Sequence, residues 1–185
     1  MKFSLSTFII ATLASVSFAA PLEARQATPT RVNPSVVAKA YESAPTMAVT
    51  VDGYGQTSRY GSGSNSVSSL VYFSQPPGSP WSGKRCNLRF SDPVVLSGSK
   101  TFAVFEFIPS NGVTFDISKA TWNQRTGYRN RELATFKVGE GSDLVYSYPC
   151  PTDGKGLNFE LTSSNGDSEI QWNSNWNQGL WLQVV

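Results

Sequence analysis

The sequence predicts an all-β protein, an antiparallel β-sandwich of about ten strands held by one disulfide. Three observations lead to this prediction. Short runs in which apolar and polar residues alternate recur from residue 46 to the end of the chain. No long run has the 3.6-residue period of a helix. The only two cysteines, Cys86 and Cys150, both fall within the alternating region.

Strands are expected wherever alternation is bounded by turn-forming residues. The clearest example is 157–161, where alternation is strict and the hairpin dipeptide Asn165-Gly166 follows. The run 100–108 is apolar on both faces, which indicates a central or covered strand. The predicted strands span 46–51, 56–60, 69–73, 85–90, 100–108, 118–124, 132–138, 144–148, 157–161, 169–173 and 179–185.

The two cysteines are expected to pair with each other. Alternation puts Cys86, Leu88 and Phe90 on one face of the strand 85–90, so Cys86 should face the core. Two cysteines in a secreted chain most simply form one disulfide. Closing a loop of 64 residues (150 minus 86) stabilises the fold by about 4 kcal/mol in the chain-entropy model. We expect Cys86–Cys150 to be a structural bridge at the edge of the core.

The N-terminal residues predict secretion. A charged start, a short apolar run and small residues at the exit make 1–19 a signal peptide, too short for a membrane span. Residues 20–45 are predicted to be a largely disordered leader, and 46–185 the folded domain. The mature chain begins after Ala19 or, with a second processing step, after Arg25. The expected location is extracellular or in a cell wall, without a lipid anchor.

One element is expected inside the leader. Asn33-Pro34 is a favourable start for a short helix that would continue to Tyr41, because asparagine caps helices and proline is tolerated in the first turn.

Composition excludes several classes of function. The chain has no histidine, which rules out a Ser-His-Asp or Cys-His nucleophile and any metal site built on imidazole. The formal net charge is only +2 and the basic residues are scattered, which argues against nucleic-acid binding. We therefore expect no catalytic residue, no cofactor and no metal site.

Carboxylates are the remaining candidates for catalysis. A pair of them could hydrolyse glycosides. Glu106 is the first candidate, because a carboxyl group within an aromatic strand can have a raised pKa. The alternative is that Glu106 lies on a solvated face or pairs with an arginine. Alternation turns Glu160 and Glu169 to the outer faces, and Asp167 belongs to a turn.

Three arginines lie close together in the sequence. Arg125, Arg129 and Arg131 flank Gly127-Tyr128 and are expected to form either an anion-contacting loop or a plain solvated loop.

A tryptophan-rich segment near the C-terminus is the candidate binding site. Sugar recognition uses flat aromatic rings beside amide side chains. By alternation Trp172 belongs to the core, Trp181 faces the other way and Trp176 lies in a loop. The candidate ligand-contacting residues are Asn175, Trp176, Gln178 and Trp181. The alternative is that Trp181 packs under a loop or edge and Trp176 covers the core.

Several short motifs resemble one fungal family. They are Cys-x-Leu-x-Phe at 86–90, Ala-Thr-Trp-Asn at 120–123, Pro-Cys-Pro at 149–151, Leu-x-Phe-x-Leu at 157–161 and the terminal Gly-Leu at 179–180. Together they resemble the C-terminal domain of the ubiquitin-three-binding protein But-two family, over residues 46–185. The resemblance provides no catalytic residues to carry over to this chain, and the family's intracellular partner does not fit a secreted chain.

The sequence thus predicts a secreted fungal β-sandwich that acts as a cell-wall-associated or host-facing binding protein. Its partner would be a cell-wall polysaccharide or an extracellular protein. The alternatives are a small extracellular polysaccharide-active enzyme using carboxylates and a protein-partner-binding domain.

Overall fold

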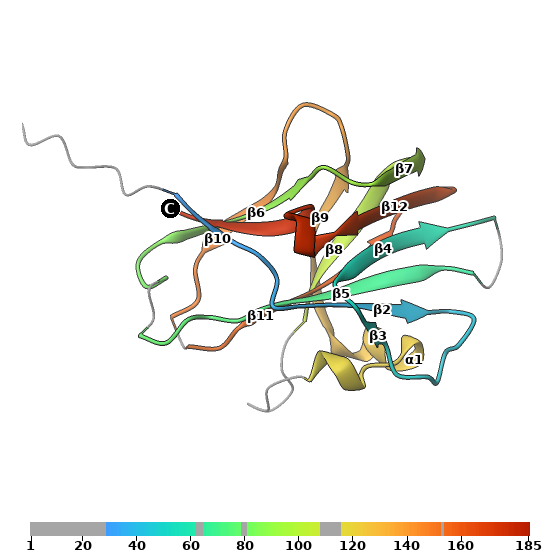
Figure 1. Cartoon of the computed structure of the whole chain (residues 1–185), viewed down its shortest axis with the longest axis horizontal. Helices are drawn as coiled ribbons and strands as arrows, with labels where there is room; N and C mark the ends of the chain where they lie inside the picture. Colours follow the sequence, from blue (N-terminus) through green and yellow to red (C-terminus); the bar gives the residue numbers. More distant parts are fainter. Residues whose placement is uncertain (1–28, 62–64, 79–80, 108–115, 153) are drawn as a thin grey trace, which may run out of the picture.

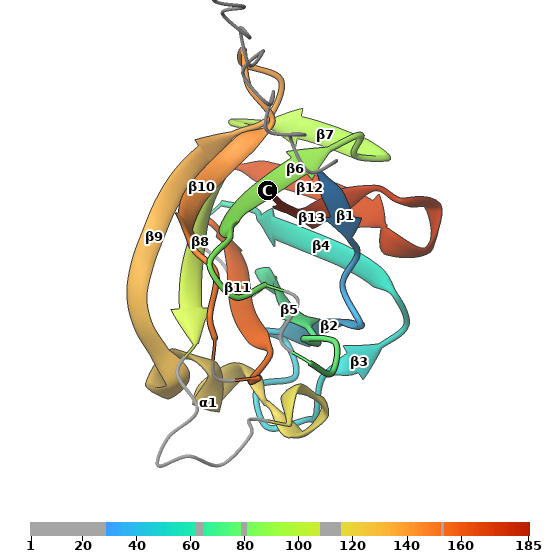
Figure 2. The same ribbon diagram turned by 90° about the vertical axis from the view of Figure 1, so that its left-hand side faces the viewer.

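The fold is an all-β sandwich with one disulfide, as predicted. The computed structural model describes residues 29–61, 65–78, 81–107, 116–152 and 154–185. In these residues, thirteen strands form two antiparallel sheets. Figures 1 and 2 show the larger sheet strongly curved around the smaller one. The predicted signal peptide and the leader up to residue 28 lie outside the described residues.

The strands of each sheet come from distant parts of the chain. The smaller sheet has the spatial order β1 (Thr30–Val32), β13 (Gly179–Val184), β6 (Arg85–Ser91) and β10 (Leu144–Pro149). The larger sheet has the order β7 (Val95–Gly98), β12 (Ser168–Asn173), β4 (Tyr54–Arg59), β5 (Val67–Phe73), β11 (Leu157–Ser163), β8 (Thr101–Phe107) and β9 (Arg129–Lys137). β2 (Val36–Tyr41) pairs with β5 and with the short β3 (Thr50–Val51).

The main core lies between the two sheets. On β11, Phe159 and Leu161 point into it and are almost fully buried. From β6, Leu88 and Phe90 meet them, so the alternation predicted for both strands is confirmed. Because successive side chains of a strand point to opposite faces, Glu160 lies on the outer face of the larger sheet.

Part of that outer face is covered by a helical segment. It contains η2 (Ile117–Lys119), α1 (Trp122–Arg125) and η3 (Thr126–Tyr128). A second group of buried apolar residues lies under it: Ala38, Ala40, Val49, Leu70, Phe107, Ile117 and Ala120. Figures 1 and 2 show α1 at one end of the larger sheet. The sandwich therefore has a third, partial layer.

The strand predicted over 118–124 is wrong, because this segment forms η2 and α1. Side-chain caps explain the difference. Asp116 accepts a hydrogen bond from the backbone N of Ser118, and Thr121 accepts one from Gln124. Such caps satisfy the backbone donors that a helix start leaves free, and they compete with strand pairing.

The helix predicted from Asn33 to Tyr41 is also wrong. Residues Val36–Tyr41 form β2, which pairs with β5 along its whole length. Here tertiary pairing overrides a local capping signal. Ordered sheet structure thus includes β1 and β2, which lie in the segment 20–45 that was predicted to be largely disordered.

Smaller differences concern strand lengths and one loop. The strand predicted over 46–51 is only β3, and Met47 is exposed. β7 was not predicted, because its four residues show no clear alternation. In the loop before β6, where no strand was predicted, Trp81 is buried in the main core.

The disulfide joins Cys86 on β6 to Cys150, which directly follows β10. β6 and β10 are neighbours in the smaller sheet, with Tyr148 opposite Cys86. Both cysteines are buried and belong to the main core. The predicted bridge and its poor accessibility are confirmed.

Candidate functional site

A hollow of about 250 Å³ opens beside β2, β4, β12 and η4 (Ser174–Trp176). We call it the Trp176 hollow. Its walls include Tyr54, Gln56, Val94, Gln171, Trp172 and Trp176. Of the four candidate ligand-contacting residues, only Trp176 lines it.

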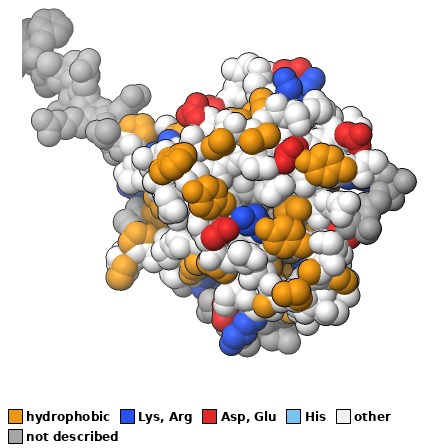
Figure 3. All heavy atoms as spheres, turned by 45° about the vertical axis from the view of Figure 1, so that its right-hand side comes forward, with side chains coloured by type: hydrophobic (Ala, Val, Ile, Leu, Met, Phe, Trp, Pro, Cys, Tyr) orange, Lys and Arg blue, Asp and Glu red, His pale blue; other side chains and the backbone are white. Residues whose placement is uncertain are grey.

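Large apolar side chains around the hollow are unusually exposed. Trp176 is 65% exposed, Val94 56% and Tyr54 46%. In Figure 3 the hydrophobic side chains of one face lie in separate small groups among polar and charged ones. A tryptophan that contributes little to the core and is held in the open is a typical contact residue for a ligand.

The turn after β12 holds Trp176 in this position. The backbone N of Asn175 donates to the side-chain oxygen of Asn173 at 3.0 Å, and Asn177 has left-handed backbone at φ 60°. The side-chain oxygen of Gln178 accepts from the backbone N of Asn173 at 3.2 Å. Gln178 thus stabilises the turn, and the turn carries the exposed ring of Trp176.

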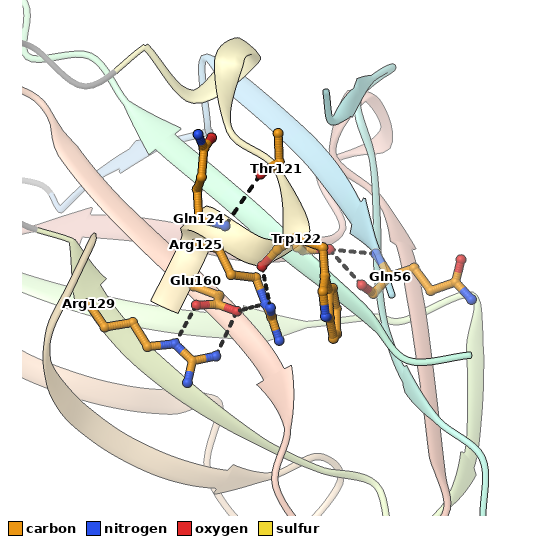
Figure 4. A network of polar contacts seen from close by, with 8 residues as sticks. Gln56, Thr121, Trp122, Gln124, Arg125, Arg129 and Glu160 are labelled. Atoms are coloured by element: carbon orange, nitrogen blue, oxygen red, sulfur yellow. Dashed lines mark hydrogen bonds and ion pairs between the residues drawn. The ribbon is translucent and has the colours of Figure 1, made fainter. Parts of the chain in front are cut away.

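Amide side chains complete the hollow. The hydroxyl of Ser69 bonds to the backbone N and O of Gln56, at 2.7 and 2.8 Å, and so holds β4 against β5. The side-chain amide of Gln56 points away from this contact, outside the dashed lines of Figure 4. Gln171 donates through its nitrogen to Glu169, which leaves its carbonyl oxygen as an acceptor. Aromatic rings and amide side chains therefore lie side by side in the hollow. The amides are those of Gln56 and Gln171, not those of the predicted Asn175 and Gln178.

Trp181 lies elsewhere, on the outer face of the smaller sheet. The guanidinium carbon of Arg31 lies 4.3 Å from the centre of its ring, and that of Arg89 lies 5.7 Å away. These cation–π contacts occupy the ring. The structure thus separates Trp181 from the Trp176 hollow.

Glu106 is an ion-pair partner. Its carboxylate accepts hydrogen bonds from Nε of Arg131 at 2.9 Å and from Asn130 at 3.2 Å. Its side chain is 25% exposed. Of the two situations expected for Glu106, the structure shows the pairing with an arginine.

Glu160 lies on the predicted outer face of the sheet and is completely buried there. Two of the three clustered arginines approach it, as Figure 4 shows. Arg129 donates Nε and Nη2 to the two carboxylate oxygens, at 2.6 and 2.8 Å. Arg125 places Nε 2.9 Å from Oε1. Alternation gives the face on which Glu160 lies, but it cannot show that the segment 116–128 covers that face.

Arg125 is itself held tightly. Its Nη1 donates to the backbone oxygen of Trp122 at 2.5 Å, and its guanidinium carbon lies 3.2 Å from the centre of the Trp122 ring. Burial lowers the pKa of Arg125, and the charge of Glu160 opposes this effect. The arginine loop predicted from the sequence is therefore not a plain solvated loop. Arg125 and Arg129 already bind a buried anion, the carboxylate of Glu160.

No protein-family model matches the chain, and no curated protein is significantly similar to it. The resemblance to the But-two family therefore stays a prediction. Within the described ranges, no helix is long and apolar enough to cross a membrane.

Proposed function

We propose that this is a secreted, non-enzymatic binding protein that attaches to cell-wall polysaccharide through the Trp176 hollow. The observation that carries the proposal is the exposure of Trp176 and Tyr54 beside the amides of Gln56 and Gln171. A pyranose ring has an apolar face that stacks on aromatic rings, and its hydroxyls bond to amides.

The hollow, of about 250 Å³, lies beside a hydrogen-bonded turn, which suits binding to a long chain at one or two of its sugar units. Its lining contains one cation, Lys39, whose Nζ lies 2.8 Å from a carboxylate oxygen of Asp52. The site thus offers apolar and amide surfaces with its charge already balanced. Neutral glycans such as chitin, β-glucan and cellulose match this chemistry.

Retention on insoluble polysaccharide tests the proposal. Wild type, Trp176→Ala, Tyr54→Ala and Trp181→Ala are incubated with chitin, β-glucan and cellulose, and the bound fraction is measured. We expect wild type and Trp181→Ala to be retained on at least one polymer. Trp176→Ala and Tyr54→Ala should each bind that polymer about tenfold more weakly, which is the usual contribution of one stacking contact. Wild type that stays in solution with every polymer overturns the proposal.

The enzymatic alternative has its own readout. Release of reducing sugar from the same polymers would favour a hydrolase, and its loss in Glu106→Gln would assign the reaction to that carboxylate. The pairing of Glu106 with Arg131 does not favour this alternative. For the second alternative, a protein partner, cross-linking in culture fluid followed by mass spectrometry is the corresponding experiment.

A further inference from the structure

We propose that a second pocket, on the outer face of the larger sheet, binds the carboxylate of an acidic sugar, a uronic acid unit. We call it the Arg129 pocket. Its volume is about 540 Å³, within the usual range of small-molecule sites of about 300–1,000 Å³. Its walls include Glu42, Ser58, Arg59, Arg125, Arg129 and Glu132. It shares no lining residue with the Trp176 hollow, so the inference does not rest on the proposed function.

Two guanidinium groups on the pocket wall share one buried carboxylate. Arg125 and Arg129 meet a single carboxylate, that of Glu160, which lies behind them and is fully buried. The side chains of the two arginines are only 10% and 23% exposed. Glu42, which also lines the pocket, is the other negative charge that acts on Arg125. A monoanion bound between the two partly desolvated guanidinium groups would add charge-assisted hydrogen bonds to both of them.

Donor atoms remain for such an anion. Arg129 donates Nε and Nη2 to Glu160, and Arg125 donates Nη1 to the backbone of Trp122. Nε of Arg125 forms an ion pair with Glu160 but no hydrogen bond. Within the described residues, no hydrogen bond is formed by Nη1 of Arg129 or by Nη2 of Arg125. Figure 4 shows these nitrogens outside the dashed lines. Charged N–H donors of this kind form hydrogen bonds to a carboxylate that are about twice as strong as neutral ones.

The rest of the pocket suits hydroxyl groups. Glu42 accepts the backbone N of Ser66, and hydrogen bonds from Ser66 lower the pKa of Glu42, so it stays ionised. Glu132 adds a second carboxylate. Ser58 is 1% exposed, and its hydroxyl has no hydrogen-bond partner in the described part of the chain. A buried hydroxyl without a partner is costly and indicates that something polar completes it.

These features together select the ligand class. A neutral sugar would offer the guanidinium nitrogens only hydroxyl acceptors, which bind them more weakly than a carboxylate does. A phosphate dianion would be repelled by Glu42 and Glu132, which also line the pocket, about twice as strongly as a monoanion. A uronic acid has one carboxylate for the arginines and several hydroxyls that donate to the glutamates. The faces of Trp122 and Phe105 carry the guanidinium groups of Arg125 and Arg129, so stacking on those rings is not part of this site.

Titration calorimetry and NMR with three matched probes test the inference: glucuronate, glucose and inorganic phosphate. We expect glucuronate to bind at least about tenfold more tightly than the other two, the usual effect of a charge-assisted hydrogen bond. Addition of glucuronate should shift the side-chain N–H signals of Arg125 and Arg129. Glucose binding as tightly as glucuronate, phosphate binding as tightly, or no binding of glucuronate would each overturn it.

Two variants locate the site without touching Glu160 or its partners. Arg59 is exposed and lines the pocket, so Arg59→Gln should weaken glucuronate binding while the protein stays folded. Trp176→Ala should bind glucuronate like wild type. If glucuronate binding is instead lost in Trp176→Ala and kept in Arg59→Gln, the acid binds in the hollow and the Arg129 pocket is refuted. Failure of polysaccharide retention leaves this experiment unaffected.

Discussion

Arg129 binds both carboxylate oxygens of Glu160 across an intervening strand. Arg129 begins β9 and Glu160 lies on β11, with β8 between them. The guanidinium group passes over the ring of Phe105, whose centre lies 4.2 Å from its central carbon, and reaches the carboxylate at 2.6 and 2.8 Å. Phe105 stands directly opposite Glu160 in the β8–β11 ladder. Three strands are thus joined by one ion pair on the outer face.

Removing the charge of Glu160 should destabilise the fold strongly. Glu160→Gln keeps the shape of the side chain but leaves two guanidinium groups, one of them deeply buried, without an anion. Breaking a buried pair in this way costs about 3–5 kcal/mol. We expect that loss in the free energy of unfolding measured with urea.

Glu132→Gln is the matched control. Glu132 lies on the neighbouring part of the same face, is exposed, and accepts a hydrogen bond from Thr135. Its substitution should change the unfolding free energy by less than about 1 kcal/mol, the usual contribution of a surface charge. Equal effects of the two variants would show that Glu160 does not organise this face.

Alkaline titration should separate Tyr60 from ordinary tyrosines. A hydrogen bond to Glu169, with burial and the negative charge of Glu169 adding to it, raises the pKa of Tyr60 from 10.0 to about 12. The neutral phenol is favoured in the folded state, so this contribution to stability is complete below pH 10 and is lost as the pH rises towards 12. Tyrosinate absorbance measured on wild type and Tyr60→Phe isolates the Tyr60 transition.

The same titration on Glu169→Gln tests the cause. Without the carboxylate, the pKa of Tyr60 should return towards 10. A transition that stays at high pH in Glu169→Gln would assign the shift to burial instead.

Alternation in the sequence correctly predicted which residues share a face, but it does not show which faces meet solvent. Glu160 does point away from Phe159 and Leu161, as its position in the strand requires. Whether that face is wet depends on the segment 116–128, which folds over it through caps at Asp116 and Thr121. Contacts of this kind join distant parts of the chain, so no local sequence pattern predicts them.

The candidate site was predictable to a similar degree. A tryptophan in a turn between two strands is expected to be exposed, and Trp176 is. Its neighbours Tyr54 and Gln56 come from β4, which pairs with β12. That pairing is a property of the sheet order and cannot be derived from alternation, which gives the face of a residue but not its neighbouring strand.

Adding a single methyl group at Gly55 should disturb the core beneath the Trp176 hollow. A β-carbon there would lie 1.9 Å from the indole of Trp172, which is fully buried. Overpacking of this severity costs about 3 kcal/mol. We expect Gly55→Ala to lower the free energy of unfolding by that amount and to weaken polysaccharide retention, since the floor of the hollow moves.

Gly127→Ala serves as its control. A β-carbon at Gly127 meets nothing within 4 Å, and its φ is not positive. Replacing glycine by alanine at a compatible position stabilises by about 0.4–1 kcal/mol. A loss of stability in Gly127→Ala similar to that in Gly55→Ala would mean that contact with Trp172 is not the cause.

The bridge between Cys86 and Cys150 should behave as a structural staple without chemistry of its own. Thiol labelling of the denatured, unreduced protein is expected to find no free thiol, and labelling after reduction should find two, because both cysteines are in the bridge.

Replacing both by alanine should lower the free energy of unfolding by about 2–4 kcal/mol, since the loop of 64 residues is no longer closed in the unfolded chain. Polysaccharide retention by this double variant, measured where it is still folded, should equal that of wild type, because neither cysteine lines the Trp176 hollow. Two reactive thiols in the unreduced protein would refute the staple.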